Sequence, residues 1–166
     1  AVSGNGAPLA QLERLAERIA PLGWHVQLYT HPDALPDLEP ALRRLPVPVV
    51  VDHMGGVKAA AGGVGHPGFR SLVRLLEGGR AWVKLSGYRS SAGPPYADVA
   101  PMARALLSAA PDRCVWGTDW PHPSLHDPAE VPDDGELLDA LGAWAPDEAA
   151  RRAVLVDNPA RLYGFP

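Results

Sequence analysis

Hydrophobic residues follow two different spacings along the chain, and the two spacings predict helices that alternate with strands. From Leu9 to Leu22 the apolar residues recur every three or four positions, as on one face of a helix, and Gly23 is placed to end that helix. Residues 47–51 form a β-branched run broken only by Pro48, a pattern typical of a strand that is buried on both faces of a parallel sheet. The chain is therefore expected to have an α/β fold.

The same two spacings divide the rest of the chain into βα units. Four strands are expected, at residues 25–30, 47–51, 81–86 and 114–118. Helices are expected at residues 9–22, 32–45, 69–76, 99–107 and 137–144, from residue 146, and in a last turn, 160–163, that Asn158 would cap. Strands alternating with helices form a parallel sheet, and no linker interrupts them, so residues 1–166 are expected to form a single unit. Four strands cannot close a barrel, which needs about eight, so the unit is either a small open sheet or half of a barrel.

Composition excludes several classes of protein. The 166 residues carry a net charge of −4 with no basic stripe, so no nucleic-acid partner is expected. No apolar run reaches the roughly 20 residues that span a bilayer, so no membrane partner is expected either. Cys114 is the one cysteine, which rules out an internal disulfide and fits a reducing, cytoplasmic location. Its apolar neighbours favour a small core residue.

Polar side chains follow every expected strand at its carboxyl end. In chain order they are Tyr29, Thr30 and His31; Asp52 and His53; Ser86, Tyr88 and Arg89; and Thr118, Asp119 and His122. Ligands bind at this end of the strands in parallel α/β folds, because the strand ends meet at one edge of the sheet. The sequence therefore predicts one shared site.

Five of these residues are candidates for chemistry. Asp119 follows an apolar strand, so it is a candidate for a general base or a metal ligand, with a structural loop residue as the alternative. His53 suits a metal ligand, a general acid or a hydrogen-bond donor, or else a satisfied core histidine. Arg89 could bind a carboxylate through its planar guanidinium group, or simply be solvated. Tyr29 and His122 could contact the same ligand.

The remaining polar residues give less reason to expect chemistry. Four histidines are expected in loops or at the surface: His25, His31, His66 and His126. Asp52 is favoured as an orienting neighbour of His53. The chain contains no His-x-His and no His-Glu-x-x-His, and His53 with Asp119 supplies two ligands where catalytic zinc sites typically use three. A self-sufficient metal site is therefore not predicted.

Several segments together resemble the amidohydrolase superfamily, and within it the branch of the 2-pyrone-4,6-dicarboxylate lactonases. They are Gly-Trp-His-Val-Gln-Leu-Tyr at 23–29, Val-Val-Val-Asp-His-Met-Gly at 49–55, Lys-Leu-Ser-Gly-Tyr-Arg at 84–89, Val-Trp-Gly-Thr-Asp-Trp-Pro-His-Pro at 115–123, and Asp-Asn-Pro-Ala-Arg-Leu-Tyr at 157–163. The resemblance implies a (β/α)8 TIM barrel in which the four strands correspond to the fifth to eighth. The chain would then be the C-terminal half of the barrel domain, and the family's first-strand His-x-His and fourth-strand arginines would lie upstream.

The resemblance also implies roles for the candidate residues. The family's water-activating aspartate falls on Asp119, and its sixth-strand histidine falls on His53. Contacts to a substrate carboxylate fall on Tyr29, Arg89 and His122. Tyr29 occupies the place where metal-dependent relatives have a histidine ligand, which implies a reaction without a metal cofactor. The alternative is a zinc or manganese ion bound by Asp119 and His53.

The resulting expectation is a hydrolase that opens a small carboxylated lactone with water activated by Asp119, as in aromatic degradation. Two alternatives stay open. One is a divalent-metal-dependent amidohydrolase or decarboxylase of the same superfamily. The other is a catalytically inactive fragment that acts as a structural or binding module, because the open sheet edges of a half-barrel favour assembly into a homo-oligomer.

Overall fold

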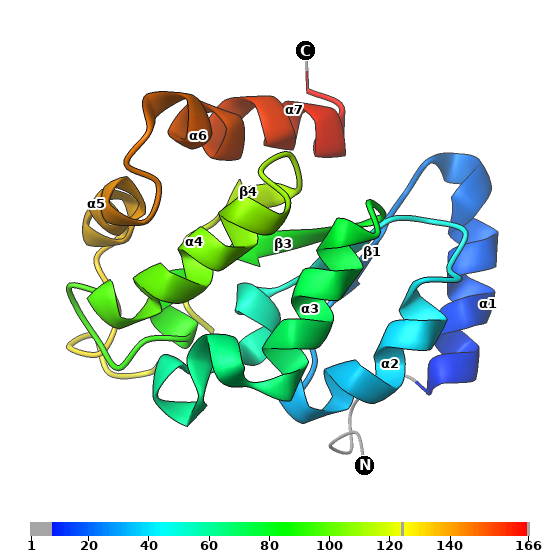
Figure 1. Cartoon of the computed structure of the whole chain (residues 1–166), viewed down its shortest axis with the longest axis horizontal. Coiled ribbons are helices and arrows are strands. Elements are labelled where there is room, and N and C mark those ends of the chain that lie inside the picture. Colours follow the sequence, from blue (N-terminus) through cyan, green and yellow to red (C-terminus); the bar gives the residue numbers. More distant parts are fainter. Residues whose placement is uncertain (1–7, 124, 166) are drawn as a thin grey trace.

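The computed structural model describes residues 8–123 and 125–165, and their strands form one parallel sheet (Figure 1). The strands pair in chain order, so each strand lies beside its sequence neighbours. They are β1 (Val26–Leu28), β2 (Val49–Val51), β3 (Ala81–Leu85) and β4 (Cys114–Trp116). The predicted α/β fold with a parallel sheet is confirmed, and each strand boundary coincides with the predicted one or lies one or two residues inside it.

Helices connect successive strands and continue past the last one. They are α1 (Leu9–Ile19), α2 (Leu35–Leu42), α3 (Pro67–Glu77), α4 (Ala100–Ala109), α5 (Asp134–Trp144), α6 (Glu148–Arg152) and α7 (Asn158–Tyr163). Helix α3 packs between α2 and α4, and α4 in turn contacts α5. Figure 1 shows α6 and α7 following one another along the top of the view, on the side of the molecule where β4 lies. Gly23, with a φ of 68°, ends the first helical segment as predicted.

Side chains alternate across the sheet and bury both of its faces. Val49 and Val51 join the large core under the helices, whereas Val50 points to the other face and packs with Trp82 and Val115. Leu162 of α7 packs against this second, smaller cluster. The β-branched run therefore forms a strand that is buried on both sides, as its sequence predicts.

The prediction that Asn158 caps the last helical turn is wrong. A π-helical segment, Ala153–Asp157, joins α6 to α7, so no free helix start exists at this position. The buried Asn158 side chain instead donates 2.8 Å hydrogen bonds to the carbonyl oxygens of Pro111 and Cys114. Asn158 thus fixes the C-terminal helices to the first residue of β4.

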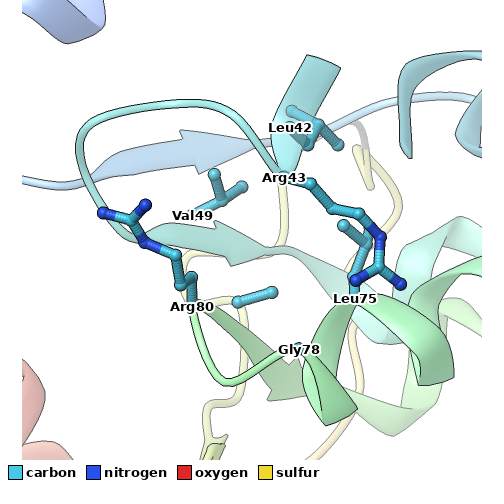
Figure 2. Close-up of a pocket in the computed structure, with 7 residues that line it drawn as sticks. Leu42, Arg43, Val49, Leu75, Gly78 and Arg80 are labelled. Carbon is cyan, nitrogen blue, oxygen red and sulfur yellow. The ribbon is translucent and has the colours of Figure 1, made fainter. Parts of the chain in front are cut away.

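A small cavity lies at the amino ends of β2 and β3 (Figure 2). Its volume is about 70 Å³, and its lining includes Val49 and Ala81, the first residues of the two strands. Arg43 beside it is already hydrogen-bonded to Glu39. Ligand pockets usually measure about 300–1,000 Å³, so this cavity is not a candidate site.

None of the helices within the described ranges combines the length and the apolar character that a membrane crossing requires.

Candidate active site

Asp119 lies where the chain leaves β4, and its two carboxylate oxygens have different partners. Oδ2 accepts hydrogen bonds from the Tyr88 hydroxyl group (2.8 Å) and from Nε of Arg89. Oδ1 lies 3.5 Å from Nε2 of His53. The φ of Asp119 is 70°, in a left-handed region that aspartate enters more readily than most residues. The ends of β2, β3 and β4 therefore bring Asp119, His53 and Arg89 into one cluster.

Competing effects determine the charge of Asp119. Burial acts to raise the pKa of the carboxyl group, since only 18% of the Asp119 side chain is exposed. Hydrogen bonds from Arg89 and Tyr88, together with the charges of His53 and Arg89, act in the opposite direction and prevail, so the pKa of Asp119 lies below its usual value. Burial and the bond to Asp119 raise the pKa of the Tyr88 phenol. At neutral pH, Asp119 is thus ionised and Tyr88 is a neutral donor.

A left-handed turn positions His53 at the end of β2. The φ angles lie between 50° and 73° at all four residues from His53 to Gly56. Glycine adopts such angles without steric cost, whereas a side chain is strained there. A Cβ atom on Gly56 would also lie only 3.1 Å from the carbonyl oxygen of Thr30. The two glycines of Asp-His-Met-Gly-Gly therefore allow the turn from which the imidazole reaches Asp119.

The imidazole of His53 is buried and neutral. Burial lowers its pKa, and the opposing charges of Asp119 and Asp52 do not reverse the shift. Nδ1 is buried without a hydrogen-bond partner among the described residues. Because a buried N–H without an acceptor is costly, we place the proton on Nε2, which faces Asp119. Ser90 Oγ donates to the backbone oxygen of His53 (3.3 Å) and ties the turn to the loop after β3.

Of the three residues expected to bind a substrate carboxylate, Arg89 and Tyr29 differ in how free they are to contact a ligand. Arg89 donates from Nε to Asp119 and from Nη2 to the carbonyl oxygen of Pro123 (2.9 Å). Its Nη1 makes no hydrogen bond to another described residue. Tyr29 is 68% exposed, and its ring packs edge-on against His53 with 5.6 Å between the centroids. Tyr29 is open to a ligand, whereas much of Arg89 is already engaged.

His122 is close to the cluster but is not open to solvent. It is 3% exposed, and its Nε2 lies 3.0 Å from Oδ1 of Asp134 at the start of α5. Its ring packs edge-on against the Tyr88 ring, with 5.2 Å between the centroids. The His122 backbone N–H donates to the carbonyl oxygen of Asp119 (2.7 Å). His122 therefore packs against Tyr88 and holds the backbone of Asp119 in place.

Sequence reasoning noted Tyr88 only as one polar residue at a strand end and gave no role to Asp134. Tyr88 directly precedes Arg89 in the loop after β3, and this adjacency is the one signal that could have linked it to the site. No sequence pattern relates Asp134 to His122, because that contact depends on how α5 returns to the sheet.

The expectation that Asp52 orients the His53 ring is wrong. The Asp52 carboxylate lies 3.2 Å from Nζ of Lys84 and accepts a 3.1 Å hydrogen bond from Gln27. Successive side chains near a strand end point to opposite faces, which explains why these neighbours do not share a contact. Asp52 instead belongs to a polar layer on the same face as Val50.

The described ranges, 8–123 and 125–165, contain no group of three or more His, Cys, Asp or Glu residues that is arranged to hold a metal ion. The four other histidines lie away from the cluster. His66 accepts a hydrogen bond from the Gly68 N–H at the start of α3, and His31 is near Asp33. His25 packs against Tyr163, and His126 is exposed.

These features together define a class of protein. The class is an α/β protein with a parallel sheet, whose strand ends hold an ionised carboxylate beside a neutral imidazole. A sequence profile of the family described as Amidohydrolase matches residues 1–165, so the chain belongs to that family. The predicted resemblance is confirmed.

Curated relatives of the chain act on lactones. It is 43% identical to a 4-sulfomuconolactone hydrolase of Rhizobium radiobacter, across 97% of this chain and 54% of that protein. It is 41% identical to a 2-pyrone-4,6-dicarboxylate hydrolase of Comamonas testosteroni, across 94% and 54%. It is 38% identical to a D-galactarolactone isomerase of Agrobacterium fabrum, across 96% and 55%. The chain therefore spans about half the length of the curated relatives it matches.

Solved structures agree on the fold. An apo protein of Agrobacterium tumefaciens superposes with a TM-score of 0.81 at 36% identity, across 96% of this chain and 57% of that one. An amidohydrolase of Burkholderia multivorans with bound zinc superposes with a TM-score of 0.77, across 95% and 58%. At 21% identity, the second match supports the fold alone.

Proposed function

We propose that the protein to which this chain belongs is a hydrolase that opens a carboxylated lactone. In this proposal, residues 1–166 are one unit that supplies strands five to eight of a (β/α)8 barrel. The observation that carries the proposal is that the two carboxylate oxygens of Asp119 have different partners. One oxygen is held by Tyr88 and Arg89, while the other lies 3.5 Å from His53 Nε2.

The geometry suits acid–base chemistry on an ester. Oδ1 of Asp119 accepts a proton from water, and the resulting hydroxide equivalent attacks the lactone carbonyl carbon. The Nε2–H group of His53 donates to the carbonyl oxygen and stabilises the negative charge of the tetrahedral intermediate. When the intermediate collapses, the ring carbon–oxygen bond breaks and the proton held by Asp119 passes to the ring oxygen. Water and lactone become a ring-opened hydroxy acid, or its keto tautomer where an enol is released.

Substrate recognition would use the groups at the rim of the cluster. The exposed Tyr29 hydroxyl and Nη1 of Arg89 remain free to donate to a carboxylate. His122 contributes by supporting Tyr88 and Asp119, because its ring is buried. The relatives named for 2-pyrone-4,6-dicarboxylate and 4-sulfomuconolactone act on lactones that carry acidic groups, which supports an anionic lactone as the substrate.

The test is Asp119→Asn in the protein that carries this chain. We expect lactone turnover to fall by about 10²–10⁴-fold, the usual contribution of a general base. Binding of substrate should change little, because the amide keeps the shape of the side chain. Asp139→Asn, on the exposed side of α5, is the matched control and should retain activity. Turnover by the Asp119 variant that approaches the wild-type rate would reject the assignment.

A metal-dependent reaction is the second candidate, and one distance favours it. Two ligands of a tetrahedral zinc ion at about 2.1 Å lie about 3.4 Å apart, close to the 3.5 Å between His53 Nε2 and Asp119 Oδ1. The described residues do not complete such a site, since they offer two ligands where three are typical. Metal analysis of the purified protein separates the candidates, because stoichiometric zinc or manganese would favour the metal-dependent reaction.

The exposed surface near β1 favours a third candidate, a module that binds without catalysing. Tyr29 and Trp24, beside this edge strand, are 68% and 62% exposed. The test assays lactone turnover by the chain alone and by a longer protein that includes an upstream half-barrel. Turnover by the longer protein would favour the hydrolase, and no turnover by either would favour the binding module. We expect little activity from the chain alone, and size-exclusion chromatography of the same samples would reveal a homo-oligomer.

A further inference from the structure

Tyr88 makes the least expected contact in the cluster. Its hydroxyl group donates a 2.8 Å hydrogen bond to Oδ2 of Asp119, the same oxygen that Arg89 binds. Two donors on one oxygen leave Oδ1 as the oxygen that faces His53. A carboxylate on a short side chain can rotate about its last bond, so an asymmetric set of donors selects its orientation.

The Tyr88 ring is itself fixed from two directions. The guanidinium carbon of Arg89 lies 5.2 Å from the ring centroid, within the range of a cation–π contact. The His122 ring packs edge-on at 5.2 Å and an interplanar angle of 85°, a favourable aromatic geometry. His122 is in turn held by Asp134, 3.0 Å away at the start of α5. A chain of contacts therefore runs from α5 to the carboxylate of Asp119.

Helix α5 also supports the backbone on which Tyr88 sits. Gly87 precedes Tyr88, and a Cβ atom built on it would lie 2.1 Å from the Cη2 atom of Trp144 at the other end of α5. The Trp144 indole N–H donates to the carbonyl oxygen of Tyr96 (3.3 Å), which fixes the indole ring against the loop that contains Gly87. The end of α5 thus packs against the backbone before Tyr88, and its start contacts the Tyr88 ring only indirectly, through His122.

We propose that Tyr88 is a positioning residue, which holds Oδ2 of Asp119 so that Oδ1 alone is presented to water and His53. This inference rests on the proposed function for its catalytic consequence, but the contact itself can be tested without turnover. Tyr88 does not touch the substrate in this proposal. It acts through the orientation of Asp119, with His122 and Asp134 holding its ring.

Tyr88→Phe is the appropriate change, because it removes the hydroxyl group and keeps the ring between Arg89 and His122. Tyr163→Phe is the matched control, since Tyr163 lies on α7 against His25 and makes no contact with Asp119. In the protein that carries this chain, we expect Tyr88→Phe to lower kcat on a lactone about 10-fold, equivalent to about 1.4 kcal/mol. KM should stay within about 2-fold, because ground-state binding does not use the hydroxyl group. Tyr163→Phe should leave both constants unchanged.

A spectroscopic readout on the 166-residue chain tests the contact independently. Carbon-13 NMR at neutral pH should show the Asp119 carboxyl and His53 ring signals moving in Tyr88→Phe and staying in place in Tyr163→Phe. Reciprocally, Asp119→Asn should move the Tyr88 Cζ signal, which covers the case in which the first variant folds poorly.

The outcomes separate this inference from the proposed function. Wild-type kcat in Tyr88→Phe, or unmoved Asp119 and His53 signals, would overturn the positioning role. A wild-type protein that turns over no lactone would overturn the proposed function and the catalytic consequence of Tyr88 together. In that case the signal shifts on the chain still decide whether Tyr88 fixes the carboxylate.

Discussion

Gly87→Ala should destabilise the chain far more than a single methyl group normally would. The added Cβ atom would lie 2.1 Å from Cη2 of Trp144, whereas carbon atoms in contact are normally about 3.5–4.0 Å apart. The indole or the loop must therefore move by about 1.4 Å or more. Trp144 is fully buried and is held by its hydrogen bond to Tyr96, so neither can yield easily.

The expected cost follows from this overlap. Overpacking of a core typically costs about 1–3 kcal/mol, and a fixed, fully buried indole places this site near 3 kcal/mol. For a chain of this length, about 2–4 °C of Tm is lost per kcal/mol, so Tm should fall by roughly 6–12 °C. Differential scanning calorimetry of the chain measures the change directly.

A second glycine provides a control, because the same change to alanine there is expected to raise stability instead of lowering it. Gly142 lies inside α5 with nothing within 4 Å of its added Cβ atom. Gly142→Ala should therefore raise stability by about 1 kcal/mol, because alanine favours the helix over glycine. In a double-mutant cycle, Trp144→Phe removes the Cη2 atom and should reduce the cost of Gly87→Ala. Equal Tm values for Gly87→Ala and the wild type would refute the packing argument.

Three further outcomes test other parts of the structure. The hydrogen bond from Arg74, with help from Arg43, lowers the pKa of Glu39 to about 2, so stability is full above pH 4.5 and declines as the pH falls toward 2. The Glu39 contribution to this decline should be roughly 2 kcal/mol and should be absent in Glu39→Gln, as measured by urea unfolding across this pH range. Asn158→Ala removes the donors to the carbonyl groups of Pro111 and Cys114, of which the Cys114 bond is buried, and should cost about 2–3 kcal/mol in the same assay. Burial raises the pKa of the Cys114 thiol to about 12, so a disulfide reagent at about pH 8 should modify it only after unfolding.

The sequence allowed much of the fold to be predicted because local patterns agree with the tertiary structure. The β-branched run at 47–51 and the stop at Gly23 are examples, since each is determined by burial or backbone conformation at that position. The prediction that Asn158 caps a helix was wrong because the tertiary structure overrides the local pattern there. A polar residue before a short helix looks like a cap, but the preceding π-helical turn removed the free helix start, and a tertiary contact took its side chain.

The location of the candidate site could be predicted from the sequence, but the hydrogen bonds within it could not. Parallel strands bring their carboxyl ends together, so the position of Asp119 near His53 follows from topology. The bonds from Tyr88 and Arg89 to one carboxylate oxygen do not, because they cross about 30 residues of chain and depend on a loop shape that Gly87 permits. Sequence reasoning therefore expected Arg89 to contact a substrate carboxylate and did not predict its hydrogen bond to Asp119.

The most direct test of the shared site is the pKa of His53, measured by NMR in the wild-type chain and in Asp119→Asn. Burial lowers this pKa, and the negative charge of Asp119, 3.5 Å away, partly restores it. Unlike charges this close attract strongly in a partly buried site, so removing the Asp119 charge should lower the His53 pKa further. The charge of Arg89, no longer balanced, acts in the same direction. An unchanged His53 pKa would show that the carboxylate and the imidazole do not share a site, and would contradict the account.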